Sequence, residues 1–315
     1  MNGITTVGGE FYGDGSSTKP FQSLETLRFE AMLEWVEWYI LGVEEFSQLK
    51  ELCVIECPKL VGGLPKQVPS WVRLEIRECS ALTASLPRTS VANEQVLNGC
   101  NGVDLGWQGV SFPEGMHSPF PSLEELIIWN CPEIESFPEG SNLRRLQIWN
   151  CEKLVACRRE WGLQRLPSLT DFTFGGGKYE EEDDDDVLES FLEEGLLPPT
   201  LTSLGISNLQ NLKSINYQSF QHLTCLKVLR ICNCPQLQSL PEEGFLPSLY
   251  RLEIDKCPLL KPRCERDRGD EWHKITHIPF IKIDGDEWHK IARTSVKSSS
   301  ANCSTLPKHQ TSQLS

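Results

Sequence analysis

The cysteines are the most obvious candidates for chemistry in this chain of 315 residues, which contains thirteen of them. Six recur at one position of a repeated pattern, namely Cys57, Cys79, Cys131, Cys151, Cys234 and Cys257. Metal ligands must converge on one point, whereas residues at one position of a repeat form a line along the array. We therefore interpret these cysteines as small buried residues, and we expect no zinc, no other metal and no cofactor.

Histidines and acidic residues offer two further candidate sites. His273 and His289 lie in two copies of the segment Gly-Asp-Glu-Trp-His-Lys-Ile, at residues 269–275 and 285–291. We find no ligands that would converge with them, and interpret both segments as part of a terminal cap. The acidic run at residues 180–186 lacks the spacing of a calcium loop. No nucleophile elbow, zinc-protease motif or Walker A sequence is present, so we expect no enzymatic activity.

The repeated pattern, Leu-x-x-Leu-x-Ile-x-x-Cys-x-x-Leu, predicts the fold. Residues 123–134 and 143–154 carry it most clearly, and about nine copies are recognisable within residues 21–263. The Leu-x-Ile segment is short and strand-like, and one copy alone cannot bury its own apolar residues. We therefore predict an α/β repeat solenoid: a leucine-rich repeat horseshoe with a concave parallel β-sheet and an irregular, loop-rich convex side.

The segments outside the pattern set the expected boundaries. Residues 1–20 are rich in glycine, serine and threonine and indicate a loop-like N-terminal leader. Residues 83–119 interrupt the repeats and leave open either a degenerate copy or an inserted loop. Residues 178–187 are expected to form an acidic, solvated loop. Residues 264–294 are expected to cap the array, and the polar residues 295–315 to be a disordered tail.

The residues between the framework positions should project from the concave face and align in columns. Trp129 and Trp149 share one column on adjacent copies, and Ile127 and Gln147 share the next. An apolar patch with charged neighbours is typical of a protein-interaction surface. Packing of both tryptophans beneath a loop such as 83–119 stays an alternative. The candidate contact residues are Arg77, Glu125, Ile127, Trp129, Arg145, Gln147, Trp149, Arg230, Arg251 and Glu253.

Composition limits the partners and the compartment. A net charge of -14 disfavours nonspecific binding to nucleic acid or to anionic membranes. No apolar run approaches the roughly 18 residues of a membrane span, and the first residues lack the features of a signal peptide. An odd number of cysteines without an export signal indicates free thiols in a reducing compartment. We expect a cytoplasmic location, with the nucleus as a further candidate.

A longer form of the pattern, Pro-Ser-Leu-x-x-Leu-x-Ile-x-x-Cys-Pro-x-(Leu or Ile), occurs at residues 121–134 and 247–260. It resembles the leucine-rich repeat region of plant intracellular immune receptors of the nucleotide-binding, coiled-coil class. Residues 7–38 are similar to the middle of that region, and residues 264–279 to its C-terminal end.

The resemblance implies a non-enzymatic recognition module. Such repeats sense pathogen effectors, directly or through a guarded host protein, and contribute to autoinhibition. The nucleotide-binding and coiled-coil domains of the parent receptor would be further partners. They are absent here, so no ATP or ADP site can be assigned. The alternative is an adaptor such as the substrate-binding arm of a ubiquitin ligase. That would usually require an F-box module, which residues 1–20 do not show.

Overall fold

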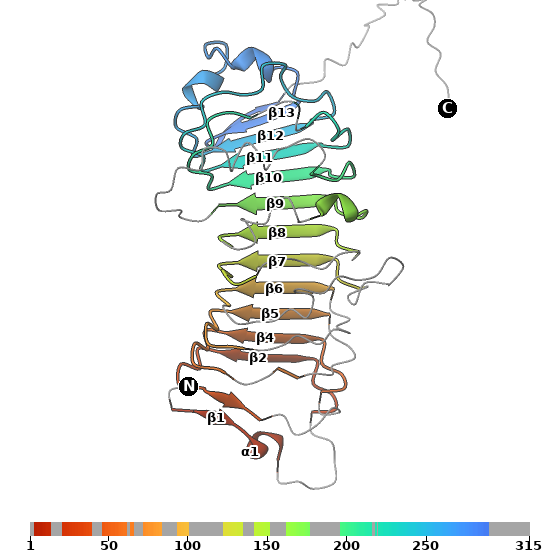
Figure 1. Cartoon of the computed structure of the whole chain (residues 1–315), viewed down its shortest axis with the longest axis vertical. Coiled ribbons are helices and arrows are strands. Elements are labelled where there is room, and N and C mark those ends of the chain that lie inside the picture. Colours follow the sequence, from red (N-terminus) through yellow and green to blue (C-terminus); the bar gives the residue numbers. More distant parts are fainter. Residues whose placement is uncertain are drawn as a thin grey trace, which may run out of the picture.

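The chain winds into an elongated stack of short strands, with one strand in each turn (Figure 1). We call one turn a rung. The computed structural model describes residues 3–13, 21–39, 46–61, 64–65, 72–83, 93–100, 122–134, 142–151, 162–176, 196–215, 218 and 220–289. The expected acidic loop at residues 178–187 and the expected tail at residues 295–315 therefore lie outside the described residues.

The main sheet has twelve strands that follow one another in chain order. They are β2 (Thr26–Glu30), β4 (Glu51–Ile55), β5 (Arg73–Arg77), β6 (Glu94–Asn98), β7 (Glu125–Trp129), β8 (Arg145–Trp149), β9 (Asp171–Gly175), β10 (Ser203–Ser207), β11 (Val228–Cys232), β12 (Arg251–Asp255), β13 (Phe280–Ile283) and β14 (Asp286–His289). All neighbouring pairs are parallel except β13 and β14, which are antiparallel. The leucine-rich repeat solenoid predicted from the sequence is confirmed.

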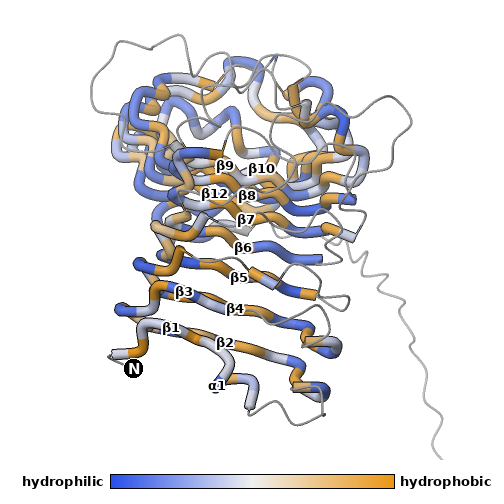
Figure 2. The backbone as a smooth tube through the Cα atoms, turned by 60° about the horizontal axis from the view of Figure 1, so that its bottom comes forward, coloured by the Kyte–Doolittle hydropathy of each residue, from blue (hydrophilic) through white to orange (hydrophobic). Residues whose placement is uncertain are grey.

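Alternation along each strand determines what faces the core. Leu126 and Ile128 of β7 pair in register with Leu146 and Ile148 of β8, and all four are fully buried. Burying one such side chain contributes about 1.5–3 kcal/mol, so the repeated leucines and isoleucines dominate stability. Figure 2 shows the resulting alternation of hydrophobic and hydrophilic residues. The remaining strand residues point to the other side, which we call the outer face; it corresponds to the concave face of the predicted horseshoe.

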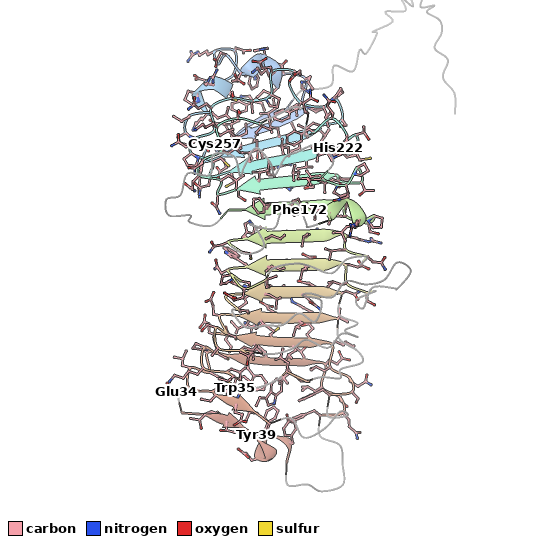
Figure 3. All side chains as sticks on the ribbon, viewed as in Figure 1. Glu34, Trp35, Tyr39, Phe172, His222 and Cys257 are labelled. Carbon is pink, nitrogen blue, oxygen red and sulfur yellow. The ribbon has the colours of Figure 1, made fainter. Side chains whose placement is uncertain are left out.

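The core runs the whole length of the stack. Buried side chains extend from Trp35 near the N-terminal end, through Phe172, to Cys257 near the C-terminal end (Figure 3). The six cysteines of the repeat position are all among the buried residues. The described helical segments are short: α1 (Gly9–Tyr12) and the 3-10 turns η2 (Leu163–Arg165), η5 (Pro262–Cys264) and η6 (Trp272–Lys274). The side opposite the sheet is thus irregular wherever it is described.

The expected loop at residues 1–20 requires correction at residues 6–12. Thr6–Val7 form β1, which pairs in parallel with β3 (Glu37–Trp38), and α1 follows directly. The physical reason is aromatic packing. Tyr12 is buried, its hydroxyl accepts a hydrogen bond of 2.9 Å from Trp38 Nε1, and its ring contacts Phe21 and Phe46. The glycines and serines around Tyr12 indicated a loop, so the sequence did not predict that Tyr12 is buried.

The interruption at residues 83–119 contains a strand of the sheet. Within its described part, β6 pairs with both neighbours, placing Gln95 in register with Leu74 and Leu126. Leu97 and Cys100 are buried as in other rungs. One rung is therefore a degenerate copy, whose pattern is concealed by a glutamine at a leucine position.

Gln95 is the weak point of this rung. It is fully buried, and neither its Oε1 nor its Nε2 has a hydrogen-bond partner in the part of the chain that the structure describes. A buried amide without partners costs about 1–3 kcal/mol. We expect Gln95→Leu to raise the free energy of unfolding by about that amount, measured by urea denaturation. The matched control is Leu74→Gln on the adjacent strand, which should lower it. A loss of stability in Gln95→Leu would show that the amide is bonded.

Candidate functional site

The candidate site lies at the centre of the outer face, on β7 and β8. These strands pair without an offset, so Trp129 is beside Trp149 and Ile127 is beside Gln147. The two indole rings are 5.6 Å apart between centroids, with 42° between their planes. Trp129 is 48% exposed, and Ile127, Gln147 and Trp149 are partly exposed. The side chains form an apolar, partly aromatic patch, which we call the tryptophan patch.

Glycines on the next rungs shape the edge of the tryptophan patch. Gly175 of β9 is in register with Trp149, and a Cβ atom there would collide with the indole ring. The Trp149 ring therefore lies close against the β9 backbone. Gly205 of β10 is beside Thr173, where a Cβ would come within 2.8 Å of the threonine side chain. The sequence prediction missed the part that Gly175 plays, although it lies in the same column as the tryptophans.

Ion pairs within the chain neutralise the charges around the tryptophan patch. Arg145 Nη1 lies 3.3 Å from each carboxylate oxygen of Glu125 on the neighbouring strand. On the C-terminal side, Glu253 pairs with Arg230 at 3.1 Å and with Arg251 on its own strand. Exposed ion pairs contribute little to stability. Their main effect is that these arginines already have carboxylate partners and do not present free charge.

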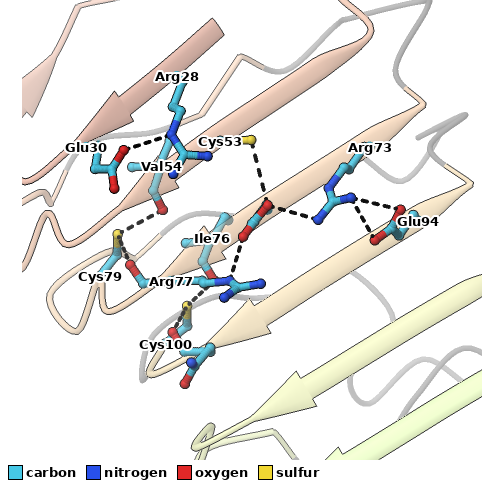
Figure 4. Close-up of polar contacts among 12 residues, drawn as sticks. Arg28, Glu30, Cys53, Val54, Arg73, Ile76, Arg77, Cys79, Glu94 and Cys100 are labelled. Carbon is cyan, nitrogen blue, oxygen red and sulfur yellow. Dashed lines mark hydrogen bonds and ion pairs between the residues drawn. The ribbon is translucent and has the colours of Figure 1, made fainter. Parts of the chain in front are cut away.

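On the N-terminal side, a buried carboxylate organises a third ionic cluster (Figure 4). Glu75 is 6% exposed, and it accepts from Arg77 at 2.6 Å and from Arg73 at 3.1 Å. Arg73 also lies 3.3 Å from Glu94. Burial raises the pKa of the neighbouring Cys53 thiol, and the Glu75 carboxylate raises it further. The sequence prediction named Arg77 but not Glu75, Arg73 or Glu94.

The ten candidate residues are therefore not one cluster. Six lie together on β7 and β8: Glu125, Ile127, Trp129, Arg145, Gln147 and Trp149. Arg77 lies on β5, two strands from β7, which corresponds to about 10 Å. Arg230, Arg251 and Glu253 lie on β11 and β12, beyond β9 and β10. A partner that contacts all ten would have to span the outer face from β5 to β12.

The alternative, in which residues 83–119 form a loop over Trp129 and Trp149, concerns a segment that lies mostly outside the described residues. Of residues 83–119, only 83 and 93–100 are described, and β6 lies beside β7 within the sheet rather than over it. Within the described part of the chain, half of the Trp129 surface is exposed.

Catalytic or metal chemistry has no arrangement to support it in the described ranges. They contain no group of three histidine, cysteine or acidic residues able to hold a metal ion. No helix among them has the length and apolar character needed to cross a membrane. His273 is an exposed residue whose Nδ1 bonds the Asp270 carbonyl oxygen at 2.7 Å. Among the repeat cysteines, burial raises the pKa of the Cys151 thiol to about 12.

The fold and the exposed columns of its outer face define a leucine-rich repeat protein. Residues 160–257 match the family model described as R13L1/DRL21 LRRs. A disease resistance protein of Arabidopsis thaliana is 35% identical over 267 residues, which is 76% of this chain and 18% of that protein. An RPP13-like disease resistance protein of the same plant is 32% identical over 180 residues, or 54% of this chain and 16% of the relative.

A shorter match extends the relationship to another plant. The disease resistance protein RGA4 of Solanum bulbocastanum is 37% identical over 51 residues, covering 16% of this chain and 5% of RGA4. The chain is a leucine-rich repeat region of the plant disease resistance type, which confirms the resemblance found in the sequence. It spans less than a fifth of the length of these relatives.

Burial of the Cys151 thiol predicts how the stability of the protein depends on pH. The ordinary pKa of 9.0 for Cys151 rises to about 12 on folding, so the folded state holds this proton more tightly. That contribution to stability is present below about pH 9 and is lost as pH rises toward 12. We expect the urea midpoint to fall over this range, and to fall less in Cys151→Ala.

A thiol reagent at pH 7 should distinguish the exposed cysteine from the buried ones by their rates of labelling. Cys225 is exposed and should react first, whereas Cys151 and Cys264 are buried and should react only after denaturation. Mass spectrometry of labelled peptides measures each site, and Cys225→Ser is the matched control. Equal labelling rates for Cys151 and Cys225 in the native protein would show that the repeat position is open to solvent.

Proposed function

We propose that this chain is a non-enzymatic recognition module acting in plant defence, and that the tryptophan patch contacts its protein partner. The observation that carries the proposal is a half-exposed tryptophan supported by a second one on a rigid sheet. Tryptophan is enriched among the residues that dominate binding energy at protein interfaces. A ring packed against a neighbouring ring also loses little conformational entropy on binding, because that neighbour already restricts it.

The character of the surroundings supports a protein partner with an uncharged contact region. Ile127, Gln147, Thr173 and Gly205 follow one another across the middle column from β7 to β10, and none is charged. The arginines on either side are held by carboxylates of this chain. Binding at the tryptophan patch then depends on burial of aromatic and aliphatic surface, and rising salt concentration weakens it only slightly. Nucleic acid, which needs free cations, does not fit this surface.

In the whole receptor, this module senses a pathogen effector, either directly or through a guarded host protein, and contributes to autoinhibition by contacting the nucleotide-binding and coiled-coil domains. The names of the similar proteins support a role in disease resistance. The proposed compartment is the cytoplasm, with the nucleus as a second one. A substrate-binding arm of a ubiquitin ligase would use the same kind of surface, but the relatives favour the defence role.

Truncation of both tryptophans tests the proposal. Trp129→Ala with Trp149→Ala should weaken binding to the partner at least about tenfold, or about 1.4 kcal/mol. Partners are identified by quantitative pull-down from plant extract with the wild-type chain, and affinities are then measured by calorimetry with the purified partner. The far-ultraviolet spectrum and melting temperature of the double variant should stay close to those of the wild type.

The matched control is Tyr250→Ala with Leu259→Ala, which removes two exposed apolar side chains far from the tryptophan patch. This control should retain binding. Unfolding of the tryptophan variant would assign both residues to stability instead of recognition. Unchanged affinity in a folded tryptophan variant would refute a role for this surface.

A further inference from the structure

Thiols from neighbouring rungs lie next to each other inside the stack. The repeat cysteine comes two residues after its strand, so Cys57 follows β4 and Cys79 follows β5. These strands pair in parallel without an offset. The pairing continues beyond them, because the Glu56 amide donates to the Arg77 carbonyl at 2.9 Å. Cys57 and Cys79 therefore lie side by side, one rung apart, which corresponds to about 4.8 Å.

The two turns that carry these cysteines have the same backbone conformation. The residue before each cysteine has a positive φ, 54° at Glu56 and 52° at Glu78. Each cysteine carbonyl accepts a hydrogen bond from the amide three residues later, at 3.2 Å after Cys57 and at 3.1 Å after Cys79. Their side chains therefore point the same way, and both are fully buried. A disulfide needs Cα atoms roughly 4.4–6.8 Å apart, and the rung spacing falls within that range.

The Cys79 thiol points toward the preceding rung. Its Sγ lies 3.5 Å from the Val54 carbonyl oxygen of β4 and 3.2 Å from the Arg77 carbonyl oxygen of its own strand (Figure 4). Cys57 Sγ lies 3.3 Å from the carbonyl oxygen of Ile55, which is also on β4. Both sulfur atoms therefore lie against the last two residues of one strand.

A hydrogen bond between the two thiols makes them chemically different. Donation from the Cys79 thiol lowers the pKa of Cys57 to about 7, although burial opposes this shift. The same hydrogen bond raises the pKa of Cys79, and burial raises it further. Cys57 is thus the sulfur that ionises, while Cys79 keeps its proton. The thiolate is the form of cysteine that reacts with oxidants.

One turn at the surface covers this pair. Glu56, Pro58 and Lys59 are exposed, whereas Cys57 between them is fully buried. The left-handed conformation of Glu56 is unfavourable for a residue with a side chain, so little energy holds this turn closed. Local opening of the turn gives a small oxidant access to Cys57 while the strands of the sheet stay paired.

We propose that Cys57 and Cys79 form a modification site, at which hydrogen peroxide joins the two sulfurs in a disulfide between the turns that follow β4 and β5. In the first step, the Cys57 thiolate attacks one peroxide oxygen and the O–O bond breaks. Cys57 becomes a sulfenic acid, and the departing hydroxide takes up the proton that the thiol released. This site is separate from the tryptophan patch and does not depend on the proposed function.

In the second step, the Cys79 sulfur attacks the Cys57 sulfur and the S–O bond breaks. The hydroxyl group leaves with the Cys79 proton as water, and the S–S bond remains. In total, two thiols are oxidised to one disulfide while one hydrogen peroxide is reduced to two waters. A dithiol reductant reverses the modification by thiol–disulfide exchange.

The disulfide would stabilise the N-terminal rungs. It closes the loop of chain between Cys57 and Cys79 and so restricts the unfolded state. The stability of a repeat array is close to a sum of contacts between neighbouring rungs, so the gain belongs chiefly to the interface of β4 with β5.

Peptide mapping of the whole chain tests the proposal, with Cys225→Ser to remove an exposed thiol. The native protein is treated with hydrogen peroxide, the remaining thiols are alkylated under denaturing conditions without reductant, and the peptides are identified by mass spectrometry. We expect a linked pair of peptides that contains Cys57 and Cys79. The link should form at least about tenfold faster than the Cys264 thiol is lost, because burial raises the pKa of Cys264 to about 12. The urea midpoint should rise on oxidation and return after dithiothreitol.

Two variants separate the paired thiols from general oxidation of the repeat cysteines. Cys79→Ala removes both the donor and the partner, so it should slow loss of the Cys57 thiol at least about fivefold and abolish the rise in the urea midpoint. The matched control, Cys151→Ala, removes a repeat thiol from another rung and should form the link at the wild-type rate. Circular dichroism establishes that each variant is folded.

Four outcomes would overturn the proposal. They are a link from Cys57 to a different cysteine, oxidation of Cys57 to a sulfinic acid without a link, equal rates of thiol loss at Cys57 and Cys264, and a link that forms only after denaturation.

Discussion

The structure depends on one constraint: no rung can bury its own apolar residues. A five-residue strand such as β7 has two core-facing side chains, Leu126 and Ile128, and only the rungs above and below exclude water from them. Stability in such an array is close to a sum of nearest-neighbour contacts. A defect at one position, such as the unbonded amide of Gln95, therefore weakens the two interfaces of β6 and leaves distant rungs intact.

The same constraint separates the residues that hold the fold from those that are free to recognise a partner. The core-facing positions are nearly uniform and carry no information about a ligand. The residues that follow each strand nevertheless prepare the outer face. Cys131 and Cys151 donate from Sγ to the carbonyls of Trp129 and Trp149, both at 3.2 Å. Asn150 adopts a positive φ and donates to the side chain of Asn130. Framework residues thus hold the backbone beneath both indoles.

The repeated Leu-x-Ile segment was sufficient to predict the register, and with it the pairing of Trp129 with Trp149. Each copy buries the same two positions, so the strands align without offset although the connections between them differ in length. Other features depend on context that spacing does not encode. Glu75 is read from the sequence as an outer-face carboxylate, but arginines at positions 73 and 77 bury it. The segment Gly-Asp-Glu-Trp-His-Lys-Ile gives a 3-10 turn at Trp272–Lys274, and its second copy contributes β14. Glu271 is buried against Lys274 and the Leu240 amide, whereas Glu287 is exposed.

The distribution of charge explains how an acidic chain can present a neutral contact surface. Seven of the acidic residues lie in the single run 180–186, so half of the net charge of -14 comes from that run. On the outer face, arginines and carboxylates alternate between neighbouring rungs and neutralise each other, as Glu125 and Arg145 do. Under the proposed function, long-range attraction or repulsion then affects the rate of encounter, and the tryptophan patch determines how long a partner stays bound.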